Sequence, residues 1–124
     1  MSTTKYTADH EWVRIDDDDT VTIGITQYAQ EQLGDIVFVQ LPEVGSRLVR
    51  GDEAVVIESV KAAADIKMPF AGEVVAVNDA LTSAPETVNS DPMGAGWFLR
   101  VRPDDRNELD GLLDEAAYAK LTQA

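Results

Sequence analysis

Short apolar segments separated by turn residues are the feature that most limits how this chain can fold. Residues 11–15 and 20–25 alternate apolar and polar side chains, which is the pattern of a strand with one buried face. Residues 54–57 and 72–77 are strongly apolar and predict strands, and residues 97–102 predict a further strand that Pro103 ends. Since the chain has 124 residues, we expect one mainly β domain with short helices at its edge. The side chains expected on the buried face of the first two strands are Val13, Ile15, Val21, Ile23 and Ile25.

Helix and turn signals account for much of the remaining chain. Residues 26–33 predict a short helix, with Thr26 as its N-terminal cap and Gly34 at its end. Residues 35–41 form a nearly continuous apolar run, which we expect to be a strand buried on both faces. The turn-rich stretch 78–96 is long for a structureless connection, so we expect it to be functional or partly helical.

The C-terminal part predicts helices over residues 104–122. Asp105 and Glu108 have the spacing of a capping box, and Asp114 is placed to cap a final helix. The apolar side chains expected to face the protein from these helices are Leu109, Leu112, Leu113, Ala117, Tyr118 and Leu121.

Charge excludes several classes of partner. The chain has 10 Lys and Arg against 23 Asp and Glu, a net charge of −13, which argues against nucleic acid and anionic membranes as partners. No apolar run approaches the ~20 residues of a membrane-spanning helix. The four aspartates at residues 16–19 predict a solvated hairpin loop, because the spaced ligands and glycine of a calcium-binding loop are missing.

The scarcity of reactive side chains argues against an enzyme. Cysteine is absent, and His10 is the one histidine, so we predict no metal site and no active site built from this chain alone. His10 and Glu11 resemble the acid–base pair of a small hydrolase, but no nucleophile is in register with them, and a strand-edge pair is the simpler interpretation. Residues 1–6 carry no secretion or import signal, so we expect the cytoplasm of a bacterium.

Lys61 is the lysine that stands out. It lies between two strand-like segments and is followed by three alanines, so a bulky partner could reach its amine. A lysine at a hairpin tip offers the primary amine that an amide-linked prosthetic group requires, although on composition alone a lysine kept for solubility is the simpler interpretation. Its spacing from other residues changes this: Glu58 lies three residues before it, Gly45 sixteen before and Gly72 eleven after, as in lipoyl domains.

Residues 58–62 resemble the lipoylation site of the H-protein family of the glycine cleavage system. The similarity extends over about residues 5–121, with departures at Met93, Ala95 and Ala64. The other segments that resemble the family are residues 6–7, 9–13, 24–30, 33–39, 41–45, 88–89, 91–92, 96–97 and 108–110.

The resemblance implies a lipoyl/biotinyl-type barrel-sandwich hybrid with peripheral and C-terminal helices. It implies one lipoyl-carrier domain over residues 1–124, with its core at about residues 30–80. It further implies (R)-lipoate bound to Lys61 as N6-lipoyllysine, with Glu58, Gly45 and Gly72 contributing to recognition by the lipoylating enzyme. The attaching enzyme would be a lipoate ligase or a lipoyl/octanoyl transferase.

A carrier role, and not an enzymatic one, follows from the same resemblance. The lipoyl arm would take an aminomethyl group from a pyridoxal-phosphate glycine decarboxylase and deliver it to a tetrahydrofolate-dependent aminomethyltransferase. A dihydrolipoyl dehydrogenase would then reoxidise the arm, and the carrier itself is expected to be a monomer. The family also has a cleft that receives the loaded arm, which would place Asp9, Glu11 and Asp65 near the carried amine. From the sequence alone, solvated surface charge remains the alternative for each of these acids.

Three other interpretations of the sequence are a biotin carrier, a lipoyl module of another enzyme complex, and a relative that is not lipoylated. Residues 66–68 half-resemble the Met-Lys-Met site of biotin carriers, but the flanking Glu and Gly are in register with Lys61, so Lys67 is expected to be an ordinary exposed strand lysine. A lipoyl module of a 2-oxoacid dehydrogenase would share the Lys61 chemistry but should lack residues 9–12 and the C-terminal helices. A relative that is not lipoylated could act as an adaptor or as a lipoyl donor.

Overall fold

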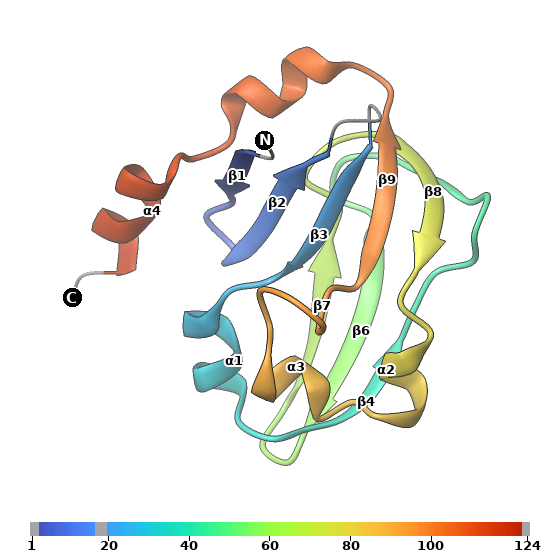
Figure 1. Ribbon diagram of the computed structural model, residues 1–124, viewed down its shortest axis with the longest axis vertical. Coiled ribbons are helices and arrows are strands. Elements are labelled where there is room, and N and C mark those ends of the chain that lie inside the picture. Colours follow the sequence, from blue (N-terminus) through green and yellow to red (C-terminus); the bar gives the residue numbers. More distant parts are fainter. Residues whose placement is uncertain (1–2, 17–19, 123–124) are drawn as a thin grey trace.

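The computed structural model describes residues 3–16 and 20–122 and contains two antiparallel sheets (Figure 1). Most of the expected loop at residues 16–19 lies outside the described residues. The larger sheet has the strand order β1-β2-β3-β9-β8-β5, and the smaller has the order β4-β6-β7. The strands are β1 (Thr3–Tyr6), β2 (Glu11–Ile15), β3 (Val21–Ile25), β4 (Ile36–Gln40), β5 (Arg47–Leu48), β6 (Glu53–Ser59), β7 (Ala63–Lys67), β8 (Gly72–Val77) and β9 (Leu99–Pro103).

The core lies between the two sheets. The larger sheet contributes buried residues such as Val13, Ile23 and Val101, and the smaller contributes Val55 and Ile57, all within one apolar cluster. The side chains predicted to face the core from β2 and β3 are buried, except for the partly exposed Ile15. The expectation of one buried face is wrong, because Trp12 and Thr22 on the opposite face are buried as well. The expected mainly β fold with short helices is nevertheless confirmed.

Strand β4 is not buried on both faces, contrary to the sequence-based expectation. Ile36 and Val39 are buried, whereas Val37 is 55% exposed and Phe38 45% exposed. The register with β6 shifts between Ile36 and Phe38, which is a β-bulge, and β4 is an edge strand of its sheet. The bulge adds a residue and redirects the side chains that follow, so two apolar side chains of this strand face solvent.

The helices lie at the periphery. Helix α1 (Gln27–Leu33) begins after Thr26, whose hydroxyl accepts a hydrogen bond from the Ala29 amide at 3.2 Å, and ends at Gly34, as predicted. The turn-rich stretch 78–96 contains two single-turn helices, α2 (Ala80–Ser83) and α3 (Thr87–Ser90). The expectation that this stretch is partly helical is confirmed.

The C-terminal helices differ in detail from the prediction. The first is a 3₁₀ helix, η1 (Arg106–Gly111), and the Glu108 carboxylate accepts from the Ala71 amide at 3.2 Å instead of closing a capping box. Helix α4 (Glu115–Thr122) is capped by Asp114 as predicted, and Tyr118 is buried. Ala117 and Leu121 are exposed, because α4 packs on the edge strand β1 and not on the core.

Candidate functional site

Lys61 lies in the turn between β6 and β7, and its side chain is exposed. The Ser59 hydroxyl organises this turn: it accepts hydrogen bonds from the amides of Lys61 (3.2 Å) and Ala62 (3.0 Å) and donates to the carbonyl of Ala62 (3.1 Å). The Ser59 amide also donates to that carbonyl, at 2.8 Å. The turn that carries the exposed amine is therefore a closed, hydrogen-bonded structure.

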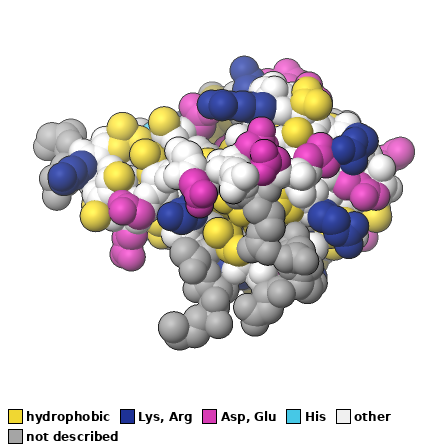
Figure 2. Space-filling view, turned by 90° about the horizontal axis from the view of Figure 1, so that it is seen from above, with side chains coloured by type: hydrophobic (Ala, Val, Ile, Leu, Met, Phe, Trp, Pro, Cys, Tyr) yellow, Lys and Arg dark blue, Asp and Glu magenta, His cyan; other side chains and the backbone are white. Residues whose placement is uncertain are grey.

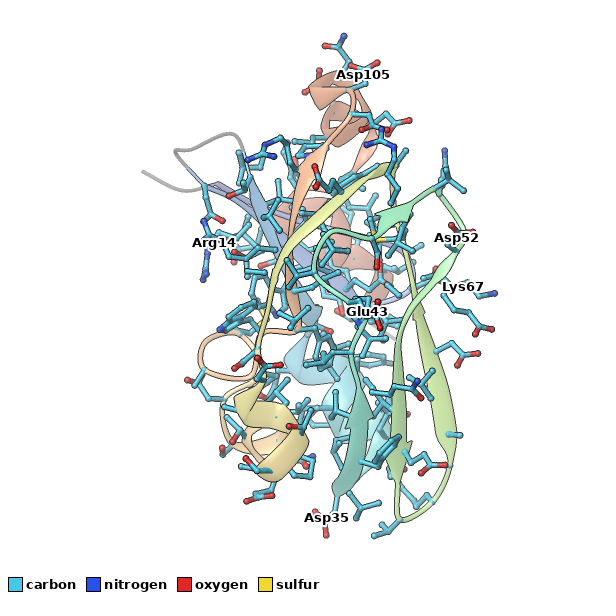
Figure 3. The ribbon with its side chains drawn as sticks, turned by 90° about the vertical axis from the view of Figure 1, so that its right-hand side faces the viewer. Arg14, Asp35, Glu43, Asp52, Lys67 and Asp105 are labelled. Carbon is cyan, nitrogen blue, oxygen red and sulfur yellow. The ribbon has the colours of Figure 1, made fainter. Side chains whose placement is uncertain are left out.

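The same turn is fixed to the loop between α1 and β4. The Val60 amide donates to the carbonyl of Asp35 at 3.0 Å, and Figure 3 shows Asp35 at the same end of the molecule as the β6–β7 turn. Asn89 of α3 holds this loop from the other side. Its Oδ1 accepts from the Ile36 amide at 2.8 Å, and its Nδ2 donates to the Gly34 carbonyl at 2.8 Å and to Gln30 Oε1 at 2.9 Å.

Gly34 leaves room for the Lys61 side chain. A Cβ on Gly34 would lie 2.9 Å from Cε of Lys61 and 3.7 Å from its Nζ. Gly34 has φ +78° and ψ −157°, a conformation that essentially only glycine adopts. Lys61 therefore lies on a turn held by hydrogen bonds, and its side chain lies over a glycine. This arrangement suits a lysine that carries an amide-linked prosthetic group.

A second feature is an acidic cleft at the other end of β7. Asp9, Glu11 and Asp65 line one cavity of about 340 Å³ together with Ile66 and Lys67. Asp9, Glu11 and Lys67 also line an adjoining cavity of about 350 Å³. The structure thus brings together the three acids named from the sequence. Asp65 lies four residues after Lys61, within the strand that follows the lysine turn.

Glu11 is the unusual group in the cleft. It is 2% exposed, and its pKa is raised to about 8, chiefly by burial and then by the negative charge of Asp9. Two hydrogen bonds to the Glu11 carboxylate lower its pKa and partly offset this rise. They come from the Thr7 hydroxyl, at 3.3 Å, and from the Lys67 amide. Glu11 is therefore mostly protonated at neutral pH, and a cation that enters the cleft would favour its ionised form.

The other residues named from the sequence lie elsewhere. Glu58 is exposed on β6, opposite Phe38 on one side and Ala63 on the other. Gly72 begins β8, at the opposite end of the molecule from the Lys61 turn, and a Cβ there would lie 2.5 Å from Cγ1 of Val101 (Figure 1). Gly45 has φ +94° in a turn. Both glycines have a structural reason for their position, and their part in recognition by a lipoylating enzyme stays a prediction.

Lys67 is an exposed residue at the end of β7, as expected, and Figure 3 shows it pointing away from the protein.

His10 does not face a nucleophile: its Nδ1 lies 2.9 Å from the hydroxyl of Tyr118, and its ring packs against Tyr28. Met93 and Ala95, the departures from the family pattern, are exposed.

Sequence reasoning missed the residues that support Lys61. From the sequence, Gly34 is predicted to end a helix and lies in a segment that resembles the family, and Asn89 enters only through that resemblance; neither is linked to Lys61. Ser59 belongs to the resembling pentapeptide, but its three hydrogen bonds depend on the shape of the turn. The α1–β4 loop reaches the hairpin only in the folded protein, so no local pattern reveals this contact.

Residues 3–16 and 20–122 contain neither a metal-binding cluster nor a membrane-spanning helix. Within them, no three His, Asp or Glu side chains are grouped to hold a metal ion. No helix in those segments has the length and apolar character needed to cross a membrane.

Comparisons with known proteins give one consistent result. Residues 4–124 match the family model described as "Glycine cleavage H-protein". The chain is 61% identical over 115 residues to the glycine cleavage system H protein of Neisseria meningitidis serogroup C, covering 93% of this chain and 90% of that relative. It is 58% identical over 124 residues to glycine cleavage system H protein 1 of Pseudomonas aeruginosa, covering 100% and 97%. The crystal structure of a glycine cleavage system H protein from Mycobacterium marinum superposes with a TM-score of 0.89 at 41% identity, covering 98% of this chain and 97% of that one.

Proposed function

Because the chain belongs to the glycine cleavage H-protein family, a family of carrier proteins and not of enzymes, we propose that it is a lipoyl-lysine carrier that shuttles the aminomethyl group of glycine. Its two-sheet fold is the lipoyl-type barrel-sandwich hybrid of that family. The whole chain acts as one carrier domain, and the single apolar cluster shared by both sheets supports this assignment.

The observation that carries the proposal is the setting of Lys61. Its amine is exposed on a turn that Ser59 closes, and its stem lies over Gly34. Attachment forms an amide between Nζ and the acyl carbon of activated lipoate. The bond from that carbon to its activating group, an adenylate or a carrier thiol, breaks, and the ammonium releases its protons to the leaving group and solvent. When bound, the lipoyl group supplies a disulfide that accepts both the one-carbon unit and electrons.

The acidic cleft is the proposed resting place of the carried amine. Asp9, Glu11 and Asp65 offer carboxylates to an ammonium, and such a charge is stabilised far more in a partly dry cleft than in open water. Glu11 would give up its proton as the cation arrives, because a positive neighbour lowers the pKa of a carboxyl. Binding of the cation and ionisation of Glu11 are therefore coupled, and the cleft gains a negative charge when the ammonium enters it.

The proposed partners are the enzymes that act on the arm. They are glycine decarboxylase, aminomethyltransferase, dihydrolipoyl dehydrogenase and the enzyme that attaches lipoate. The relatives named above are bacterial, which supports a carrier of the bacterial cytoplasm. A monomer suffices for the role, because Lys61 and the three acids of the cleft belong to one chain.

The proposal is tested in two stages. The protein is first incubated with a lipoate ligase, lipoate and ATP, and peptide mapping should place one lipoyl group on Lys61. Lys61→Arg should abolish the gain in mass, and Lys67→Arg, the matched control, should leave it unchanged. The lipoylated protein should then support exchange of the glycine carboxyl carbon with bicarbonate by glycine decarboxylase. A protein that accepts lipoate but supports no exchange would be a lipoyl donor or adaptor, and the carrier proposal would fail.

A further inference from the structure

We propose that the face formed by Asp35, Val37, Phe38, Glu58 and Val60 is the docking surface for the enzyme that acylates Lys61. The inference rests on the proposed function and extends it: the family resemblance already implies a part for Glu58 in recognition, and the inference adds Asp35, Val37, Phe38 and Val60 to that surface. The expected partner is an acyl-transferring enzyme that presents apolar and basic side chains around the opening of its acyl-binding channel. We call these five residues the docking face.

The bulge in β4 supplies the apolar part of the docking face. Val37, Phe38 and Val60 are 55%, 45% and 66% exposed. The strand register places Phe38 directly opposite Glu58, and Val60 is bonded through its amide to Asp35. Exposed apolar side chains gathered on one part of a surface mark contact sites for other proteins. Val60 directly precedes the residue that has to be modified, and Phe38 lies opposite Glu58, three residues before it.

Charge complementarity indicates the kind of partner. Asp35 and Glu58 are exposed, and within the described segments no ion pair involves either of them. The opposite end of the molecule differs: Figure 2 shows basic side chains interspersed with acidic ones there, and Arg47 pairs with Asp104 at 2.6 Å. The acids near Lys61 are therefore available to basic groups of a partner, which would also steer its approach.

Among the possible partners, the acylating enzyme is the one that must form a covalent bond at the lysine itself. An enzyme that forms a bond at Nζ has to bring its acyl carbon to the end of the short lysine side chain, and its surface must then cover the neighbouring residues. An enzyme that acts later on the far end of an attached arm is not forced into this contact. Hydrogen bonds hold the backbone beside the docking face: Asn89 accepts from the Ile36 amide, and Asp35 accepts from the Val60 amide. A backbone that is already ordered loses less conformational entropy when a partner binds.

The test compares rates of acylation with a lipoate ligase, lipoate and ATP. Phe38→Ser and Val37→Ser should each lower kcat/KM for lipoylation about five- to thirty-fold, as expected for truncated contact residues. The matched controls are Val44→Ser and Val49→Ser, which remove side chains that are 60% and 58% exposed far from the lysine, and they should stay within about twofold of wild type. Glu58→Gln should slow lipoylation several-fold, whereas Glu53→Gln, the same change at the other end of β6, should not.

Two further measurements separate the possible failures. Acylation of Lys61 by a small activated octanoyl ester and thermal unfolding should be unchanged in every variant, which shows that the amine and the fold are intact. If the wild type accepts lipoate and the Val37 and Phe38 variants accept it equally fast, the docking inference is wrong and the proposed function stands. If the wild type accepts no lipoate, the proposed function itself fails. A wild-type dimer that these substitutions convert to a monomer would assign the face to a second copy of the chain and overturn the inference.

Discussion

The side chain of Lys61 lies directly over Gly34, and a Cβ on that glycine would come within 2.9 Å of the lysine Cε. The residue that carries the proposed cofactor is therefore positioned by a residue 27 places earlier in the chain, where the absence of a side chain is the essential property. Gly34 is needed here for two reasons, its backbone conformation and its lack of a side chain. A matched pair of glycine variants can distinguish the two.

Gly34→Ala should lower the free energy of unfolding by about 1–3 kcal/mol, because its φ of +78° is strained for alanine, and it should also displace the Lys61 stem. Gly51→Ala is the control: Gly51 has φ +91°, but no atom lies within 4 Å of its missing Cβ. Both variants should lose stability in chemical denaturation. Only Gly34→Ala should change the rate at which the Lys61 amine reacts with a small acylating reagent, and equal rates in the two variants would contradict the contact.

Glu11 should make stability depend on pH. Its pKa is about 4.5 in the unfolded chain and about 8 in the folded protein, so between these values the folded state holds a proton that the unfolded state has lost. The free energy of unfolding of the wild type should therefore fall as pH rises through this interval, by at most about 1.4 kcal/mol per pH unit. Glu11→Gln, which cannot ionise, should gain stability relative to wild type from pH 5 to pH 9 in denaturant titrations. A constant difference between the two proteins would contradict the raised pKa.

Ser59→Ala should loosen the Lys61 turn, because three hydrogen bonds share the serine hydroxyl. We expect a loss of about 1–3 kcal/mol in the free energy of unfolding. Amide hydrogen exchange at residues 60–62 should also be faster. Ser90→Ala, which removes one hydroxyl that donates to the Thr87 carbonyl at 3.3 Å, is the control and should change neither measurement at the hairpin.

Tyr118→Phe should weaken the attachment of α4. The Tyr118 hydroxyl lies 2.6 Å from Oγ1 of Thr26 and 2.9 Å from Nδ1 of His10, while its ring stacks on Tyr6 at 4.7 Å. Phenylalanine keeps the stacking and loses the hydrogen bonds, so a loss of about 1 kcal/mol is expected. Hydrogen exchange should rise in residues 115–122 and in the loop before Glu11. Tyr28→Phe, which leaves these bonds in place, should leave exchange in α4 unchanged.

Local patterns in the sequence identified most of the strands and both ends of α1. They failed at β4, where a continuous apolar run was expected to be buried on both faces. Val37 and Phe38 face solvent because a bulge at the edge of a three-stranded sheet redirects them, and a bulge depends on the partner strand. Similarly, Ala117 and Leu121 have the spacing of a buried helical face, yet α4 packs on the edge of the larger sheet and leaves them exposed.

The sequence by itself determined the mainly β fold, the lysine on a hairpin and the acidic character of the chain, because strand periodicity, turn residues and charge are local or additive properties. Tertiary structure alone decided that Gly34, Asp35 and Asn89 support the Lys61 turn and that Glu11 is buried beside Asp9 and Asp65. It also raised the pKa of Glu11, since desolvation depends on every segment packed around a group and not on its neighbours in the chain.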